Sequence, residues 1–115
     1  MAKEDTKFDV AVIGAGPAGI MAAGQAAVSG AKVVLIEKNK QFGKKILLTG
    51  NGRCNITNAE FNLKNLVSNY NNGEFLFHVF SVFGPAQTIQ FFNDLGVATK
   101  IEDSKRETWF LNLQS

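Results

Sequence analysis

The chain has 115 residues, enough for one domain with a real core, and its composition of 45% hydrophobic and 19% charged residues is typical of a soluble globular protein. A formal net charge of +2 is too small to imply a nucleic-acid partner, and no apolar run approaches the ~20 residues of a membrane span. The short charged N-terminus lacks the apolar core of a signal peptide, and one cysteine cannot form an internal disulfide, so a cytoplasmic setting is expected.

The first expected elements form a βαβ unit. Phe8–Gly14 (FDVAVIG) is an almost continuous apolar run, which is typical of a strand buried on both faces of a parallel sheet. Pro17–Ser29 is rich in alanine and glycine; its proline suits a first helical position, and Gly30 suits the stop just past the end. Ala31–Glu37 (AKVVLIE) is a second buried-type strand. The fold class predicted is therefore α/β, a Rossmann-like unit with parallel strands at about 8–14 and 31–37 and a right-handed crossover.

The second half of the chain is expected to be mostly helical. Residues 38–58 are interpreted as an extended loop, with a short strand or turn at 46–48, and residues 59–73 as holding a short irregular helix. The stretch 74–83 (EFLFHVFSVF) is strongly apolar, and Pro85–Leu95 is predicted to be a helix closed by Gly96. A last strand is expected at 97–102.

The turn after the first strand, Gly14 to Gly19 (GAGPAG), matches G-x-G-x-x-G in the strand–helix context that makes the pattern informative. Gly14 permits the tight turn, Gly16 lets a pyrophosphate approach the backbone, and Gly19 lets helix and strand pack closely. The helix N-terminus offers unpaired N–H groups to phosphates. Glu37, at the end of the second strand, is placed to accept hydrogen bonds from ribose hydroxyls and would repel the 2′-phosphate of NADP. The alternative is a ligand-free turn with a solvated Glu37, and the motif does not choose between NAD and FAD.

Residues 41–58 (QFGKKILLTGNGRCNITN) form the most unusual stretch of the sequence. Asn-Gly pairs are turn formers, so a polar surface loop is one interpretation. Lys44, Lys45, Arg53 and the small residues favour a loop that closes over an anionic, planar ligand, because cations offset phosphate charge. Arg53 would favour a Cys54 thiolate, yet no partner cysteine exists for a disulfide relay, so a packing or flavin-contact role is preferred for Cys54.

These motifs together resemble the N-terminal part of the aminoacetone-oxidase-like family of FAD-binding oxidoreductases, which includes bile-acid reductase relatives. The resemblance rests on GAGPAG, on the GRCN-x-TN segment that starts at Gly52, and on Phe91–Val97 (FFNDLGV), and it covers about residues 8–103. It implies FAD as the cofactor and NAD(P)H as the expected electron donor of the intact enzyme. The implied cofactor-binding residues are Gly14, Gly16, Pro17, Ala18, Gly19, Glu37, Lys38, Lys44, Gly52, Arg53, Cys54 and Asn55.

The sequence also departs from this family. Family members are several times longer, and residues 104–115 (SKRETWFLNLQS) lack the expected G-R-x-F-P segment, so we expect a fragment. The expected organisation is an FAD-binding βαβ unit with the GRCN loop at 1–58, a helical continuation of the same domain at 59–103, and a divergent tail at 104–115.

The function expected is the FAD-binding portion of a flavin-dependent oxidoreductase, inactive by itself. The alternatives are an NAD-binding Rossmann module of a dehydrogenase and a non-enzymatic remnant. The expected partners are a small-molecule substrate and the remainder of the enzyme fold, not nucleic acid or membrane, and neither a catalytic residue nor a metal-ligand cluster can be named.

The apolar stretch 74–83 carries a further expectation. Phe75, Phe77, Phe80 and Phe83 fall on two sides of a helix, which is more apolar surface than a βαβ unit can cover. These side chains should be exposed or drive association. His78, a lone histidine among phenylalanines, is expected to be packed or partly exposed rather than a base.

Overall fold

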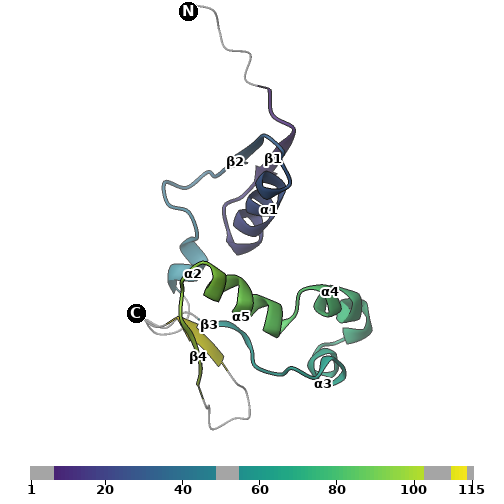
Figure 1. The fold of residues 1–115 in the computed structure, drawn as a ribbon. Coiled ribbons are helices and arrows are strands. Elements are labelled where there is room, and N and C mark those ends of the chain that lie inside the picture. Colours follow the sequence, from purple (N-terminus) through teal and green to yellow (C-terminus); the bar gives the residue numbers. More distant parts are fainter. Residues whose placement is uncertain (1–6, 49–54, 103–109, 114–115) are drawn as a thin grey trace, which may run out of the picture. The chain divides into compact units, whose positions relative to one another are not determined.

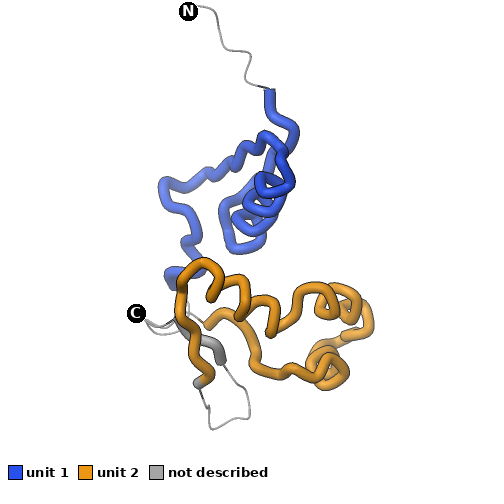
Figure 2. Tube along the Cα trace, in the orientation of Figure 1, with its two compact units in different colours: residues 1–49 blue, residues 50–115 orange. Residues whose placement is uncertain are grey.

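The computed structural model describes residues 7–48, 55–102 and 110–113 of the chain. It divides the chain into two compact units, residues 1–49 and 50–115, shown in blue and orange in Figure 2. The expected division at residue 58 stays a prediction.

The first unit is built on the expected βαβ arrangement (Figure 1). Strand β1 (Val10–Ile13), helix α1 (Pro17–Val28) and strand β2 (Val33–Ile36) follow one another along the chain. The two strands pair in parallel, with Val10 opposite Val33 and Ile13 opposite Ile36, which confirms the predicted Rossmann-like pairing. Helix α1 starts at a proline and is followed by Gly30 at φ +91°, a left-handed conformation that a side chain would strain.

The prediction that both strands are buried on both faces is wrong for the described part of this unit. Burial alternates along β1, and its last residue, Ile13, is 84% exposed, while Ile36 at the end of β2 is 50% exposed. Helix α1 contacts both strands, but one helix can cover only one face of a sheet. The apolar runs therefore mark strands that have a second face available for a further layer.

Residues 46–48 were expected to form a short strand or turn, and this expectation is wrong. They belong to a short helix, α2 (Lys44–Leu48), which follows Gly43 at φ +63°. The Gly43 carbonyl accepts hydrogen bonds from the N–H groups of Ile46 at 2.9 Å and Leu47 at 3.2 Å. Lysine and leucine favour helix, so this local turn needs no sheet partner.

The second unit combines an antiparallel sheet with helices. Strands β3 (Asn55–Asn58), β5 (Phe110–Leu113) and β4 (Thr99–Glu102) form a sheet in the order β3-β5-β4. The expected strand at 97–102 is present as β4, whereas β3 lies in a region interpreted as loop and β5 in the expected tail. Helix α5 (Pro85–Asp94) contacts β3 and β4, and Gly96 follows it at φ +77°, as its predicted glycine stop requires.

Three short helical segments complete the second unit: α3 (Leu63–Ser68), the 3₁₀ segment η1 (Gly73–Leu76) and α4 (Phe77–Val82). Helix α3 begins at Asn62, whose side chain accepts a hydrogen bond from the Asn65 N–H at 3.1 Å. Leu66 of this helix is only 3% exposed. A Cβ at Gly73 would lie 1.7 Å from the Val67 carbonyl oxygen, so η1 approaches α3 more closely than any side chain allows.

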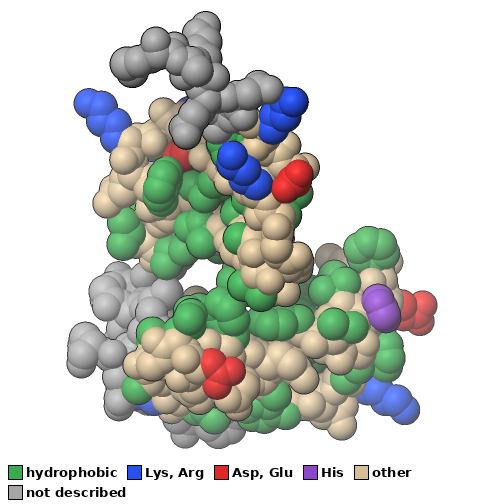
Figure 3. Space-filling view, turned by 45° about the horizontal axis from the view of Figure 1, so that its top comes forward, with side chains coloured by type: hydrophobic (Ala, Val, Ile, Leu, Met, Phe, Trp, Pro, Cys, Tyr) green, Lys and Arg blue, Asp and Glu red, His purple; other side chains and the backbone are tan. Residues whose placement is uncertain are grey.

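The apolar stretch of the second unit is only partly covered. Phe75, Phe77 and Phe83 are exposed, as expected, and apolar side chains are visible on the molecular surface in green (Figure 3). The expectation is wrong for Phe80, which is half-buried with its ring centroid 5.6 Å from that of Tyr70. His78 is exposed on α4.

By length and composition, one helical stretch among the described residues, Gly73–Asp94, could cross a membrane, contrary to the sequence expectation. The stretch is not one helix, because it changes from η1 to α4 and then breaks before α5. At the break, Phe83 has φ −140° and Gly84 is extended. One stretch of this kind is weak evidence for a membrane span, because the core helix of a soluble protein meets the same criteria.

Candidate functional site

The glycine turn follows the carboxyl end of β1 and is hydrogen-bonded to the carboxyl end of β2. Gly14, at φ +96°, donates its N–H to the Ile36 carbonyl oxygen at 2.7 Å, so the turn is tied to the end of β2. A Cβ at Gly19 would lie 1.8 Å from the Gly14 carbonyl oxygen. Helix α1 can start this close to the strand end only with glycine at that position.

The N-terminus of α1 is open. Gly16 precedes the helix with extended backbone and no side-chain cap, and a Cβ there would meet nothing within 4 Å. Pro17 has no N–H, and no described residue accepts a hydrogen bond from the N–H of Ala18 or Gly19. Among the described residues these N–H groups have no acceptor, and the space beside Gly16 is open at the positive end of the helix dipole, which is the arrangement that binds phosphate.

The Glu37 carboxylate lies against this turn. Its Oε2 accepts a hydrogen bond from the Ala15 N–H at 2.8 Å. Its Oε1 accepts two more, from the Asn39 N–H at 2.8 Å and from Asn39 Nδ2 at 3.0 Å. These bonds, the Asn39 backbone N–H first and the Ala15 N–H second, hold the pKa of Glu37 below its usual value. The side chain is therefore an anion held beside the glycine turn at neutral pH.

Gly43 also contacts the turn, although it is not among the individually predicted cofactor-binding residues. Its N–H donates to the Ala15 carbonyl oxygen at 2.8 Å, so the buried Ala15 is held on both sides, by Glu37 and by Gly43. The only sequence signal was a glycine just before two lysines. Asn39 was missed as well, because nothing in its spacing shows that it contacts Glu37.

The structure brings together Gly14, Gly16, Pro17, Ala18, Gly19 and Glu37 within the first unit. Lys38 and Lys44 are exposed and adjoin Glu37 and Gly43 in the chain. Asn55 is an exposed residue at the start of β3, in the second unit. Gly52, Arg53 and Cys54 lie outside the described residues.

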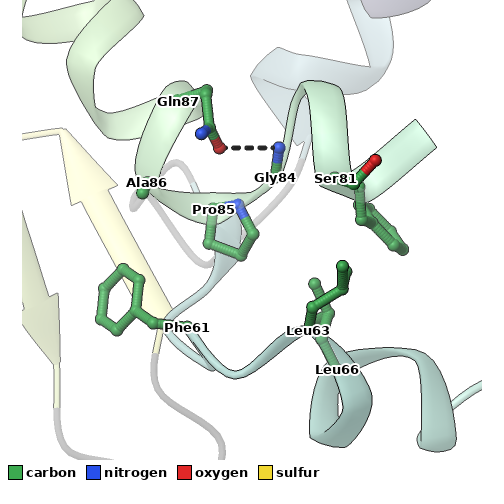
Figure 4. Close-up of a pocket in the computed structure, with 9 residues that line it drawn as sticks. Phe61, Leu63, Leu66, Ser81, Gly84, Pro85, Ala86 and Gln87 are labelled. Carbon is green, nitrogen blue, oxygen red and sulfur yellow. Dashed lines mark hydrogen bonds between the residues drawn. The ribbon is translucent and has the colours of Figure 1, made fainter. Parts of the chain in front are cut away.

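The second unit contains a separate pocket of 240 Å³ (Figure 4). Its polar groups are engaged locally, since Gln87 Oε1 accepts the Gly84 N–H at 3.0 Å and Ser81 Oγ donates to the His78 carbonyl oxygen at 2.7 Å. No predicted cofactor-binding residue lines it. The lining residues are Phe61, Leu63, Leu66, Phe80, Ser81, Gly84, Pro85, Ala86 and Gln87. Across the described ranges, no group of three His, Cys, Asp or Glu side chains is arranged to hold a metal ion.

A parallel βαβ unit, a glycine turn that opens a helix, and an acidic residue at the end of the second strand together define a Rossmann-type dinucleotide-binding protein. Residues 8–109 match the family described as HI0933-like protein Rossmann domain, and the chain belongs to that family.

Three relatives illustrate the range of proteins that the chain is similar to. It is 43% identical over 95 residues to the 3-dehydro-bile acid delta(4,6)-reductase of Clostridium scindens, a match covering 79% of this chain and 22% of the relative. It is 48% identical over 52 residues to the ribosomal RNA dihydrouridine synthase of Escherichia coli, a match covering 45% of this chain and 13% of the relative. It is 65% identical over 37 residues to digeranylgeranylglycerophospholipid reductase 1 of Methanosphaera stadtmanae, a match covering 32% of this chain and 9% of the relative. The chain thus spans at most 22% of the length of these relatives.

The family assignment confirms the predicted resemblance and the predicted fold class. Together with the reductases among the relatives, it confirms FAD as the predicted cofactor. The relatives named are enzymes. The synthase among them means that the expected absence of a nucleic-acid partner does not follow from the comparisons.

Proposed function

We propose that the first unit binds the adenosine diphosphate half of FAD, and that the whole enzyme transfers a hydride from NAD(P)H through the flavin to a small-molecule substrate. One observation carries this proposal. The open N-terminus of the 12-residue helix α1 lies beside the Glu37 carboxylate, and both are joined through the buried residue Ala15. Hydrogen-bond donors for a phosphate and a hydrogen-bond acceptor for a ribose hydroxyl are thereby fixed on one turn.

The residues present fit FAD. The N–H groups of Ala18 and Gly19 have no described partner, and the space at Gly16 admits an oxygen-rich group close to the backbone. No acidic residue in the first turn of α1 would repel a pyrophosphate. Glu37 is a stronger hydrogen-bond acceptor when ionised than when protonated, and its lowered pKa keeps it ionised at neutral pH. When bound, the isoalloxazine supplies the hydride chemistry, and the protein orients the cofactor.

The remaining predicted cofactor contacts are part of the same proposal. Lys38 and Lys44 provide positive charge next to the site in the chain, and we assign Gly52, Arg53, Cys54 and Asn55 to the loop that contacts the pyrophosphate, ribityl or isoalloxazine portions of FAD. Support comes from the family resemblance and from the basic and small residues of this loop.

The wider organisation is also proposed. We place the FAD-binding unit with its loop at 1–58, its helical continuation at 59–103 and a divergent tail at 104–115. The partner of this chain is the remainder of the enzyme fold, and the compartment proposed is the cytoplasm, where a single free cysteine stays reduced.

Two substrate classes are supported by specific relatives. A small molecule is favoured, because the relative matched over 79% of this chain is a bile acid reductase. RNA is the second candidate, because the chain is similar to a ribosomal RNA dihydrouridine synthase. Titrating RNA into the chain at low and moderate salt separates them. We expect no saturable binding, whereas salt-dependent saturable binding would favour RNA.

The central test compares two glycine substitutions for which the structure has room. A Cβ at either Gly16 or Gly24 would meet nothing within 4 Å, yet only Gly16 borders the open helix N-terminus. We expect Gly16→Ala to weaken FAD and ADP binding by about tenfold or more, because its methyl group occupies the phosphate approach. Isothermal titration calorimetry measures the affinities, and thermal unfolding reports the fold.

Gly24→Ala is the matched control. It lies within α1, where alanine is favoured over glycine by about 0.5–1 kcal/mol, so the chain should become slightly more stable with its affinity unchanged. Equal affinities for both variants would contradict the proposed site. A wild-type chain that binds NAD more tightly than FAD would favour the dehydrogenase alternative, and one that binds neither at high micromolar concentration would favour the remnant.

A further inference from the structure

The Glu37 carboxylate has almost no free hydrogen-bonding capacity. A carboxylate offers about four acceptor directions, two on each oxygen. Asn39 occupies both directions on Oε1, through its backbone N–H and its Nδ2 group. The Ala15 N–H takes one direction on Oε2. An incoming hydroxyl group can therefore donate a hydrogen bond only to Oε2.

We propose that Asn39 is a positioning residue that makes Glu37 recognise one of the two adenosine ribose hydroxyls rather than both. Asn39 holds Oε1, the Ala15 N–H orients Oε2 toward the glycine turn, and the single remaining acceptor direction meets one hydroxyl. This inference rests on the proposed binding of the adenosine diphosphate half of FAD.

The Asn39 side chain adds something that its backbone does not. A backbone N–H would be present with any residue except proline at position 39, but the Nδ2 bond at 3.0 Å requires a side-chain donor of this reach. Glu37 and Asn39 are both accessible to solvent, so without the second bond the carboxylate would exchange rotamers and partners with water. The same contacts with neutral N–H groups hold the pKa of Glu37 low.

The first experiment is a thermodynamic cycle between the side chain and the ligand hydroxyls. The wild-type 115-residue chain and Asn39→Ala are titrated with ADP, 2′-deoxy-ADP, 3′-deoxy-ADP and 2′,3′-dideoxy-ADP. In the wild type, we expect the loss of one hydroxyl to weaken binding about tenfold and the loss of the other to change it less than about twofold. Lys40→Ala, an exposed neighbouring change, is the control and should behave as wild type.

The variant should lose both affinity and selectivity. We expect Asn39→Ala to bind ADP about three- to tenfold more weakly and to tolerate the two monodeoxy analogues equally. With dideoxy-ADP the variant and the wild type should be equal, since no hydroxyl remains for Glu37 to accept. A merely structural role of Asn39 would weaken all four ligands by the same factor, and this result would overturn the inference.

A ligand-free measurement tests the contact itself. In an NMR titration, the Glu37 carboxyl and the Ala15 amide should titrate together in the wild type, with a pKa below the usual value. In Asn39→Ala the pKa should rise toward the usual value. An unshifted wild-type pKa would overturn the inference even if ADP binds. If Asn39→Ala keeps its selectivity between the two hydroxyls, the role of Asn39 is overturned and the proposed function stands. If the wild type shows this titration but binds neither ADP nor FAD, both the proposed function and the ribose assignment are overturned.

Discussion

At the residue scale, glycine is suited to three positions of one turn for three different physical reasons. Gly14 adopts a left-handed backbone at φ +96°, Gly19 leaves no room for a Cβ beside the Gly14 carbonyl, and Gly16 has open space at an uncapped helix end. The first two are structural requirements of the turn itself. Of these three glycines, only Gly16 has neither a left-handed backbone nor a close neighbour, which is why it is the position of the turn that reports on a ligand.

Glu37 links this turn to pH. Its folded-state pKa lies below the usual value of 4.5, so the carboxylate stabilises the fold fully above that pH and loses this contribution as the pH falls through the lowered pKa. We expect the stability difference between the wild type and Glu37→Gln to be constant near neutral pH and to shrink below about pH 4.5. Urea unfolding across this pH range measures it. A difference that grows on acidification would contradict the hydrogen bonds to Ala15 and Asn39.

At the element scale, backbone proximity organises the helices of the second unit. Segment η1 follows α3 through Asn72, which adopts a left-handed backbone at φ 57°. Gly73 then brings η1 against the end of α3, near the Val67 carbonyl. Two contacts between aromatic rings involve helices α4 and α5. The ring centroids of Tyr70 and Phe80 lie 5.6 Å apart, and those of Phe83 and Phe91 lie 6.4 Å apart.

Substituting Gly73 tests this organisation. Because its Cβ would meet backbone atoms at 1.7 Å, η1 would have to move away from α3, and we expect Gly73→Ala to lower the free energy of unfolding by roughly 2–3 kcal/mol. Asn71→Ala, at an exposed turn position, should change it by less than about 0.5 kcal/mol. Denaturant unfolding compares the two. Equal stabilities would show that α3 and η1 are not in close contact.

At the scale of the whole molecule, the chain exposes much apolar surface. Phe75 is 85% exposed in the second unit, as Ile13 is at 84% in the first, and Val79 and Val82 are also exposed. Surface of this kind marks interaction sites or drives association. Its extent agrees with a chain that spans 22% of the length of the bile acid reductase that it matches.

Apolar exposure predicts measurable association. We expect the double variant Phe75→Ser with Val79→Ser to bind less hydrophobic dye than the wild type and to associate less at high concentration, because two exposed apolar side chains are removed. Sedimentation velocity and dye fluorescence measure both effects. Glu74→Ser, a polar change in the same segment, is the control. A wild-type chain that is monomeric and binds no dye would contradict the prediction.

The sequence alone determined the features that depend on local chemistry. Apolar runs, Pro17 and Gly30 located the βαβ unit, and the turn at Gly14–Gly19 predicted its open helix end. Pro85 and Gly96 likewise bounded α5. Proline and glycine restrict or free the backbone at their own positions, so their effects can be read without a partner. The GRCN motif indicated the family through resemblance.

Only the tertiary structure decided the contacts between residues far apart in the chain. The Glu37 and Gly43 bonds to Ala15, the half-burial of Phe80 against Tyr70, and the position of β5 between β3 and β4 depend on coordinates that no spacing specifies. The exposure of Ile13 could not be predicted either, because an apolar strand has the same sequence pattern whether or not a second layer covers it. Local patterns identify which side chains seek partners, and packing determines which partners they meet.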